Sequence, residues 1–155
     1  MNPLSSAEMP VVVFTWSIDI VKADGSSDKI GEFIGEAFET YAASRSVVCD
    51  YKDFCFAAMS GQKIVGAITG HAYYKEIHIG DLIVSPECRG LDIGTALVRR
   101  VESEFEGGDY ENINLTTYGF QALEFYKKLG YEVEYTRPSS DPKLVKYFLL
   151  KRLAQ

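Results

Sequence analysis

Apolar residues recur along the chain with two different periods, and these periods predict where strands and helices lie. The first apolar run, VVVFTWSIDIV at residues 11–21, is rich in β-branched and aromatic residues and predicts an opening strand. After the turn ADGSSD, apolar residues recur at helical spacing from about residue 29 to residue 43. This pattern predicts a helix with one face packed on a sheet. The face consists of Ile30, Phe33, Ile34, Ala37, Phe38 and Tyr41.

The middle and the end of the chain alternate between the two periods. FCFAAMS, the turn GQK and IVGAITGHAYY predict a hairpin, and EIHIGDLIV predicts the third strand of an antiparallel meander. A repeat of apolar residues at every fourth position from Ile93 to Phe105 predicts a helix that ends near EGGD. INLTT is then a short strand, FQALEFYKKLG a helix closed by Gly130, and YEVEYTR a strand. KLVKYFLLKRL predicts a closing strand, although its length also permits a short helix.

The predicted order is strand, helix, three strands, helix, strand, helix and two strands. A meander followed by strands that alternate with helices predicts a mixed sheet covered on both faces. The chain has 155 residues, 46% of them apolar, which is enough for one core. Because no repeat or flexible linker divides the sequence, we expect a single domain over residues 1–155.

Charge and cysteine content narrow the setting. The formal net charge of -6 argues against nucleic-acid binding, which needs clustered basic residues, and it is compatible with a cationic small substrate. Cys49, Cys55 and Cys88 have neither metal-type spacing nor a disulfide pattern, so we expect buried, reduced thiols. The first residues do not resemble a leader, and no apolar run has the length of a membrane span. We therefore expect a soluble, cytoplasmic protein without a membrane partner.

The loop RGLDIGT, between the third strand of the meander and the next helix, has features of an anion site. A helix N-terminus offers free amides and a positive dipole end, and glycines let the backbone approach an anion. Arg89 adds positive charge, and Gly90 and Gly94 add access. Asp92 lies in the middle of the loop, where a glycine would be expected. On its own such a loop is a common structural connection and a weak signal.

Two stretches together resemble the signature regions of the GCN5-related N-acetyltransferase (GNAT) superfamily. DLIV with RGLDIGTAL is similar to the Arg/Gln-x-x-Gly-x-Gly/Ala loop that binds the pyrophosphate of acetyl-CoA in that family. LTTYGFQALEFYKKLGYEVEY is similar to the second region, whose helix ends in a Phe-Tyr-Lys-Lys-x-Gly-Tyr/Phe pattern. The resemblance covers residues 77–153. It implies an α/β (α+β) fold with a mixed, mostly antiparallel central sheet and helices on both faces.

The resemblance also implies a set of cofactor-binding residues. Asp92 occupies the position of the family's first motif glycine, where a carboxylate facing the pyrophosphate would be repelled. Its backbone amide can instead face the phosphate while the side chain turns to solvent or caps the helix, because aspartate tolerates left-handed backbone and favours N-caps. We favour this second arrangement. The implied acetyl-CoA-binding residues are Leu82, Val84, Arg89, Gly90, Leu91, Asp92, Ile93, Gly94, Thr95 and Tyr126.

The strand HIGDLIV is expected to carry groups that act on the acceptor amine. Strict alternation places His78, Gly80, Leu82 and Val84 on one face and the intervening residues, Asp81 among them, on the other. The resemblance implies that this strand splays from its neighbour and that the Val84 amide holds the acetyl oxygen. His78 lies where relatives carry a proton relay, and imidazole suits a general base near neutral pH. A histidine hydrogen-bonded between strands is the alternative, which leaves Asp81 or water as the base.

Two further positions are candidates for binding the acceptor. Asp81 is a carboxylate in an apolar strand; it either binds a substrate ammonium or holds a neighbouring loop through its amides. By analogy with the fold, the acceptor is expected near Trp16, Tyr73 and Tyr74. Tyr73 is therefore a candidate substrate residue.

Tyr126 is the candidate general acid. In the resembling enzymes the tyrosine at this place lies beside the cofactor sulfur and protonates the departing thiolate, and a phenol stays protonated at neutral pH. Helical spacing puts Phe125 and Leu129 on the core side with Tyr126 at the edge of that stripe, so a purely structural aromatic is the alternative. Many relatives carry an asparagine near the cofactor where this chain has Gly119, so that side-chain contact is either absent or replaced, with Gln121 as the candidate replacement.

Taken together, the resemblance implies an acetyl-CoA-dependent N-acetyltransferase. It would transfer the acetyl group to a primary amine, of a small molecule or a protein, by direct attack in a ternary complex and without a metal. The alternatives are a catalytically silent acyl-CoA-binding sensor and an interaction domain that binds no nucleotide. Dimers are common in the family, which leaves a homodimer open.

Overall fold

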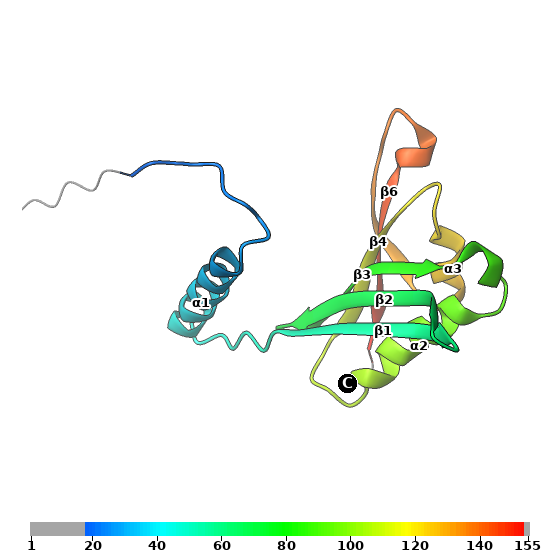
Figure 1. Cartoon of the computed structure of the whole chain (residues 1–155), viewed down its shortest axis with the longest axis horizontal. Helices are drawn as coiled ribbons and strands as arrows, with labels where there is room; N and C mark the ends of the chain where they lie inside the picture. Colours follow the sequence, from blue (N-terminus) through cyan, green and yellow to red (C-terminus); the bar gives the residue numbers. More distant parts are fainter. Residues whose placement is uncertain (1–17, 154–155) are drawn as a thin grey trace, which may run out of the picture. The chain divides into compact units, whose positions relative to one another are not determined.

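The computed structural model describes residues 18–153 (Figure 1). From α1 onward the order of helices and strands is the predicted one. The elements are α1 (Asp28–Ser44), β1 (Lys52–Ser60), β2 (Lys63–Tyr73), β3 (Glu76–Val84), η1 (Pro86–Cys88), α2 (Ile93–Glu104), β4 (Asn112–Tyr118), α3 (Leu123–Lys128), β5 (Glu132–Arg137), η2 (Pro142–Leu144) and β6 (Lys146–Arg152). The predicted opening strand at residues 11–21 lies mostly outside the described residues, and its described end, residues 18–21, has no regular secondary structure.

The chain divides into two compact units with a boundary inside α1, after Phe38. The apolar stripe of α1 is exposed, with Phe33 at 71% and both Phe38 and Tyr41 at 62%. Packing of this stripe on a sheet, and a single domain over the whole chain, therefore stay predictions. No helix among residues 18–153 has the length and apolar character that crossing a membrane requires.

The second unit contains a six-stranded mixed sheet in the order β1-β2-β3-β4-β6-β5. Among the strands of residues 18–153, β3 and β4 pair in parallel and the other neighbouring pairs are antiparallel. The hairpin turn of β1 and β2 falls at Gly61, whose φ of 60° is readily adopted by glycine. The predicted mixed, mostly antiparallel α+β fold is confirmed.

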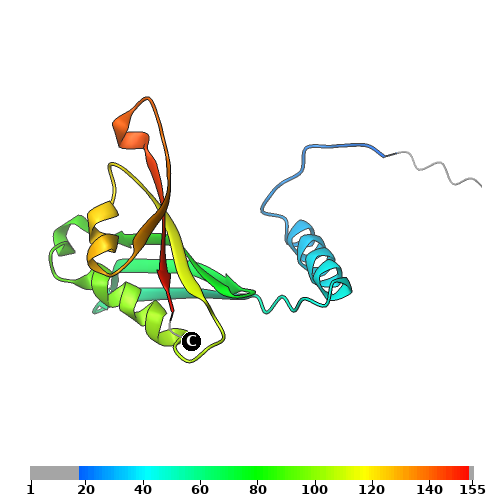
Figure 2. The ribbon, with the colours of Figure 1, turned by 180° about the vertical axis from the view of Figure 1, so that it is seen from behind.

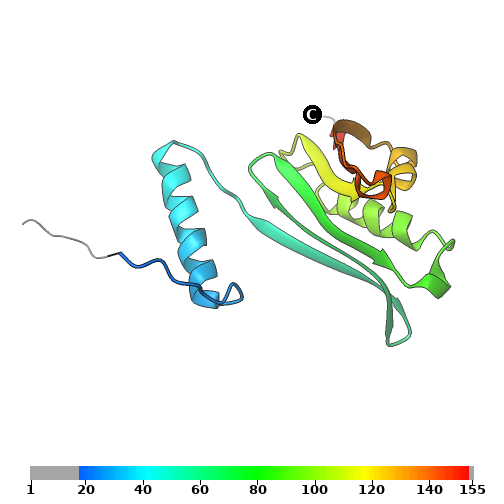
Figure 3. The ribbon, with the colours of Figure 1, turned by 90° about the horizontal axis from the view of Figure 1, so that it is seen from above.

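One face of the sheet carries the core. Helix α2 packs on β1, β2 and β3, and it buries Leu97, Val98 and Val101 against that face (Figure 3). Tyr126 of α3 belongs to the same buried cluster, and Figure 2 shows α2 crossing in front of the strands. A helix on the other face stays a prediction. Cys55 points away from α2 and is exposed, so the expectation of three buried cysteines is wrong; all three are free thiols.

A β-bulge at Gly80 changes which residues of β3 face the core. Thr69 pairs with Asp81 but Gly70 pairs with Ile79, which leaves Gly80 as the extra residue of the strand. Before the bulge Ile77 and Ile79 are buried; after it Leu82 and Val84 are half-buried and Asp81 and Ile83 are exposed. The strict alternation predicted from sequence is therefore wrong. His78 and Asp81 share the face opposite α2, and Leu82 and Val84 lie on the core side.

Strands β3 and β4 separate where the bulge begins. They pair over four residues only, from Glu76 opposite Asn112 to Ile79 opposite Leu115. A bulge bends its strand, and Figure 1 shows the two strands diverging beyond this point. The edge of β3 from Gly80 to Val84 is therefore open toward β4, which agrees with the predicted splay.

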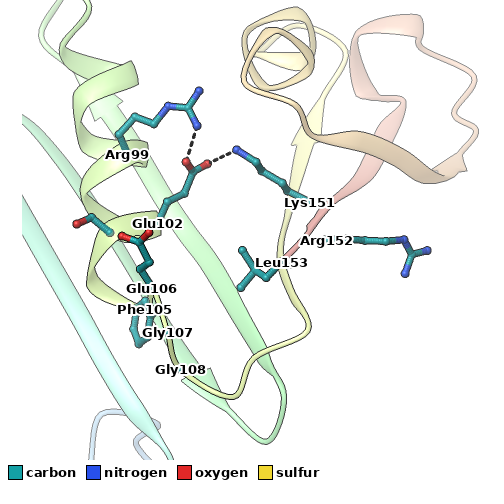
Figure 4. Close-up of a pocket in the computed structure, with 10 residues that line it drawn as sticks. Arg99, Glu102, Phe105, Glu106, Gly107, Gly108, Lys151, Arg152 and Leu153 are labelled. Atoms are coloured by element: carbon teal, nitrogen blue, oxygen red, sulfur yellow. Dashed lines mark hydrogen bonds and ion pairs between the residues drawn. The ribbon is translucent and has the colours of Figure 1, made fainter. Parts of the chain in front are cut away.

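An ion-pair network ties the end of α2 to β6 (Figure 4), and it also reaches the end of α3. The Glu102 carboxylate accepts from Arg99 Nη1 at 2.5 Å, from Lys151 Nζ at 2.9 Å and from the Tyr131 hydroxyl at 3.4 Å. Lys151 Nζ also donates to the Leu129 carbonyl at 3.1 Å. The network borders a cavity of about 500 Å³.

Lys151→Ala should lower the free energy of unfolding by about 2 kcal/mol, because it leaves a largely buried carboxylate with one cation fewer and the Leu129 carbonyl without its donor. The side chains of Lys151 and Glu102 are only 25% and 16% exposed. Chemical denaturation measures the change. Lys63→Ala is the matched control, since the Lys63–Glu87 pair is 67% and 55% exposed and should contribute nothing measurable. If both variants lost the same free energy of unfolding, burial of the Lys151–Glu102 pair would not explain its contribution.

Candidate functional site

The open edge of β3 presents backbone groups of two predicted cofactor residues. In an antiparallel ladder successive amides point to opposite sides of the strand. The Ser85 amide donates to the Val65 carbonyl of β2 at 2.8 Å, so the amides of Val84 and Leu82 point away from β2. They face the gap toward β4. Arg89 reaches the same edge, where its Nε donates to the Val84 carbonyl at 3.4 Å.

The loop before α2 adopts the backbone that an anion site needs. Gly90 has a φ of 80° and Asp92 a φ of 57°, so both are left-handed. The first α2 hydrogen bond joins the Ala96 amide to the Asp92 carbonyl at 2.9 Å. The amides of Ile93, Gly94 and Thr95 precede that bond and have no acceptor within the helix. These donors, at the positive end of the helix dipole, are suited to a phosphate oxygen.

The Asp92 side chain only partly follows the expectation. Its left-handed backbone is confirmed, and the residue is exposed, so the carboxylate turns to solvent. It makes no capping hydrogen bond to α2, so the capping alternative is wrong. The left-handed backbone at this N-cap turns the chain sharply into the helix. Aspartate adopts left-handed backbone more readily than most residues. That the Asp92 amide faces a phosphate stays a prediction.

Gly94 lies where three elements meet. A Cβ atom at Gly94 would lie 3.3 Å from the Phe125 ring of α3 and 3.8 Å from the Val84 side chain. The start of α2, the end of β3 and the start of α3 are therefore in contact. Ile93 packs inward on Gly66 of β2, whereas Leu91 is 67% exposed at the tip of the loop. Thr95 is half-buried.

Tyr126 is buried more deeply than its spacing predicts. It is 6% exposed and belongs to the core cluster, so the expected place at the edge of the stripe is wrong. Its ring packs edge-on against Phe125 and Tyr131. Burial raises the pKa of Tyr126 to about 12. The Tyr126 hydroxyl makes no hydrogen bond among residues 18–153. Every fully buried side-chain oxygen and nitrogen in that range has a hydrogen-bond partner. The Tyr126 oxygen is therefore not fully buried and reaches the surface.

The turn after α3 holds Tyr126 in place. Gly130 has a φ of 92°, and its amide donates to the Lys127 carbonyl at 3.0 Å. The Tyr131 amide donates to the Tyr126 carbonyl at 3.1 Å. These two bonds form a Schellman motif, which confirms the predicted glycine cap.

His78 lies beside an asparagine that the sequence did not single out. Its Nδ1 is 2.7 Å from Asn114 Oδ1, across the parallel pairing of β3 and β4. Asn114 in turn contacts Glu76 and Asn112. The polar alternation of Asn112, Asn114 and Thr116 within a strand was the available signal. Its meaning depends on the neighbouring strand, which the sequence alone does not identify.

The other acceptor candidates gather on the face of His78. The His71 ring stacks with those of Tyr51 and Tyr73, at centroid distances of 5.7 Å and 5.3 Å, and is 5.4 Å from His78. The pKa of His71 is lowered, mainly by partial burial and to a smaller extent by the neighbouring His78. Asp81 accepts from the Thr69 hydroxyl at 3.3 Å and accepts no hydrogen bond from a loop amide among the described residues. Trp16 lies outside those residues.

Gly119 has a structural cause. A Cβ atom there would lie 2.5 Å from the Pro142 carbonyl oxygen, and the Gly119 amide donates to the Val145 carbonyl at 2.9 Å. No side chain fits at this position. Gln121 uses its Oε1 to accept from the Tyr118 amide at 2.9 Å, so this oxygen holds the turn between β4 and α3.

Comparison with known proteins agrees with this arrangement. The model of the acetyltransferase (GNAT) family matches residues 26–131. Blasticidin-S acetyltransferase of Streptomyces morookaense is 28% identical over 59% of this chain and 68% of its own. A crystal structure of an acetyltransferase from Bacillus cereus is 26% identical, with a TM-score of 0.68, over 86% of this chain and 98% of its own. An aminoglycoside 6'-N-acetyltransferase complexed with coenzyme A shares the fold at 21% identity, with a TM-score of 0.55, over 81% of each chain. Because the family model matches more than half of the residues of this chain, the chain belongs to the acetyltransferase (GNAT) family.

Proposed function

We propose that this acetyltransferase uses acetyl-CoA to acetylate a primary amine by direct attack in a ternary complex. The observation that carries the proposal is the open edge of β3 beyond Ile79. The free amides of α2 and the Tyr126 ring lie on one face of the sheet at this edge, and His78 and Asp81 lie on the other. A thioester held in the gap would be accessible to an amine from the opposite face.

Cofactor binding is assigned to the edge and the loop. The α2 amides of Ile93, Gly94 and Thr95, with Arg89 and the left-handed turn at Gly90 to Asp92, would hold the pyrophosphate. The Leu82 amide, which faces the gap, would donate to a carbonyl of the pantetheine arm, and the Val84 amide to the acetyl oxygen. This assignment makes the loop the main source of affinity for coenzyme A.

The proposed chemistry moves one acetyl group, takes two protons from the acceptor nitrogen and gives one proton to the sulfur. His78 takes a proton from the ammonium, the amine nitrogen bonds to the thioester carbon, and the Val84 amide stabilises the oxyanion. The carbon–sulfur bond then breaks, Tyr126 donates its proton to the leaving thiolate, and the nitrogen releases its second proton, which through solvent returns Tyr126 to the phenol. With a pKa of about 12, Tyr126 is protonated at neutral pH. Such a phenol can protonate the thiolate because the same burial also raises the proton affinity of the sulfur.

Turnover of acetyl-CoA with a panel of amines tests the proposal. The panel contains diamines, lysine-containing peptides and blasticidin S. Blasticidin S is included because one relative is named blasticidin-S acetyltransferase. We expect acetylation of at least one amine, with loss of activity in His78→Ala. Binding of coenzyme A without turnover on any amine would instead favour a catalytically silent sensor. The acceptor's identity, a homodimer and a cytoplasmic location stay predictions.

Asp92→Gly should keep or tighten coenzyme A binding. The carboxylate makes no capping bond, glycine adopts the left-handed backbone without strain, and a negative charge near the pyrophosphate is removed. Calorimetric titration with coenzyme A measures the affinity. Asp92→Asn is the matched control, since it removes the charge and keeps a residue that tolerates this φ. A tenfold or larger loss of affinity in both variants would show that the carboxylate assists binding and would contradict the assignment.

A further inference from the structure

Four polar side chains on β3 and β4 form a chain of hydrogen bonds that ends at His78. Glu76 lies opposite Asn112, and His78 lies opposite Asn114, in the parallel pairing. Asn112 Nδ2 donates to Glu76 Oε1 at 3.3 Å, and Asn114 Nδ2 donates to Glu76 Oε2 at 3.3 Å and to Asn112 Oδ1 at 3.0 Å. Asn114 Oδ1 is 2.7 Å from His78 Nδ1, the shortest contact of the chain.

The carboxylate at one end fixes the direction of every bond. An ionised carboxylate only accepts hydrogen bonds, so the amide group that faces Glu76 must present its NH2. The Asn114 oxygen is thereby turned to His78. An amide oxygen also only accepts, so Nδ1 of His78 must carry the hydrogen. In the neutral imidazole the lone pair then lies on Nε2.

We propose that Asn114 is a positioning residue, which fixes His78 in the Nδ1–H tautomer so that Nε2 is the nitrogen that takes the proton of the acceptor amine. The proposal rests on the base role proposed for His78. Without the Asn114 oxygen, the neutral ring could place its hydrogen on Nε2, and a ring in that form cannot accept the proton there. Asn114 thus acts through His78 and needs no contact with either substrate.

The titratable or charged groups around His78 come from its own strand, which also carries Asp81 on the same face, and from the neighbouring strands. Glu76 is on the same strand, and His71 of β2 lies 5.4 Å away between ring centroids. Glu134 of β5 and Arg152 of β6 line, with His78 and Asn114, a cavity of about 350 Å³. None of these side chains hydrogen-bonds to the His78 ring within residues 18–153, whereas Asn114 does. The tautomer is therefore set by Asn114.

A tautomer measurement tests the proposal without turnover. Long-range ¹H–¹⁵N correlation spectra of the ¹⁵N-labelled full chain, above the titration of the imidazole, distinguish the two neutral forms of His78. We expect Nδ1–H to dominate in the natural chain and in Asn112→Ala, and to lose its dominance in Asn114→Leu. A dominant Nε2–H form in the natural chain would overturn the proposal, as would an unchanged spectrum of His78 in folded Asn114→Leu.

Kinetics with an accepted amine then separates the positioning role from the base role. Asn114→Asp places a carboxylate on Nδ1, which favours the imidazolium. A base must be deprotonated to act, so the acid limb of kcat/KM should move to higher pH by about one unit. Asn114→Leu should lower kcat about tenfold and leave the KM for acetyl-CoA unchanged. An Nδ1–H ring combined with an acid limb that does not move would show that His78 is not the base and would overturn both roles.

Discussion

Tyr126→Phe is expected to lower kcat about 100-fold while the KM for acetyl-CoA changes little, because loss of a general acid typically costs at least this factor. The ring stays in the core, where it packs on Phe125 and Tyr131, so the fold should be retained. The lost hydroxyl has no partner among residues 18–153, so its removal breaks no protein hydrogen bond. A fall in kcat without a fall in stability would identify a role in the chemistry.

Tyr131→Phe is the control. It removes a buried phenol of the same cluster, whose only side-chain hydrogen bond within residues 18–153 is the 3.4 Å contact to Glu102. Steady-state kinetics on both variants, with thermal unfolding alongside, separates the two hydroxyls. If Tyr126→Phe kept full kcat, water or another group would protonate the thiolate, and Tyr126 would be a structural residue.

The raised pKa of Tyr126 also predicts a pH dependence. An acid must be protonated to act, so activity that depends on Tyr126 is lost only as the pH rises through about 12. Tyr126 should therefore cause no basic limb in the kcat profile between about pH 7 and pH 10. A basic limb in that range that disappears in Tyr126→Phe would contradict the effect of burial.

Much of the fold was predictable because its elements follow local patterns. The every-fourth repeat from Ile93 to Phe105 and the glycine at 130 each fix a local conformation, and both are found where predicted. The open edge beyond Ile79 was expected from the family resemblance alone. Residue periodicity carries no information about where two neighbouring strands stop pairing.

The faces of β3 were mispredicted because one residue breaks the period. The alternation rule assumes that successive side chains point to opposite faces of the sheet. Gly80 is an extra residue with no partner on β2, so the rule fails there. A glycine within a strand pattern is the available signal for a bulge, although it does not say that a bulge is present. As a result His78 was grouped with Val84, whereas the structure groups it with Asp81.

Contacts between strands were the second limit. Asn114 lies 36 positions after His78, and the two meet only because β3 and β4 are parallel neighbours in one register. Gly119 was similarly interpreted as a lost cofactor contact, while its cause is the approach of the Pro142 carbonyl from a distant loop. Both facts depend on tertiary structure, which a single sequence does not specify.

Gly70→Ala is expected to lower the free energy of unfolding by about 3 kcal/mol, because the added methyl has no room in a packed sheet. A Cβ atom at Gly70 would overlap the His78 carbonyl oxygen and two carbon atoms of the Phe54 ring. The farthest of these three atoms would be only 2.9 Å from the new Cβ. The carbonyl belongs to the backbone at the start of the bulge and cannot rotate away. Relief of the overlap would push β3 from β2, at the point where the edge toward β4 opens.

The matched control is Gly80→Ala, in the neighbouring strand. There the nearest atom to the new Cβ would be the Thr69 carbonyl oxygen at 3.6 Å, an ordinary contact, and the backbone is not left-handed. Its stability should change by less than about 1 kcal/mol. Urea denaturation gives both values from the midpoints, provided that the slope is unchanged. Similar losses in the two variants would mean that glycine flexibility, and not the close approach of the His78 carbonyl, governs stability at the bulge.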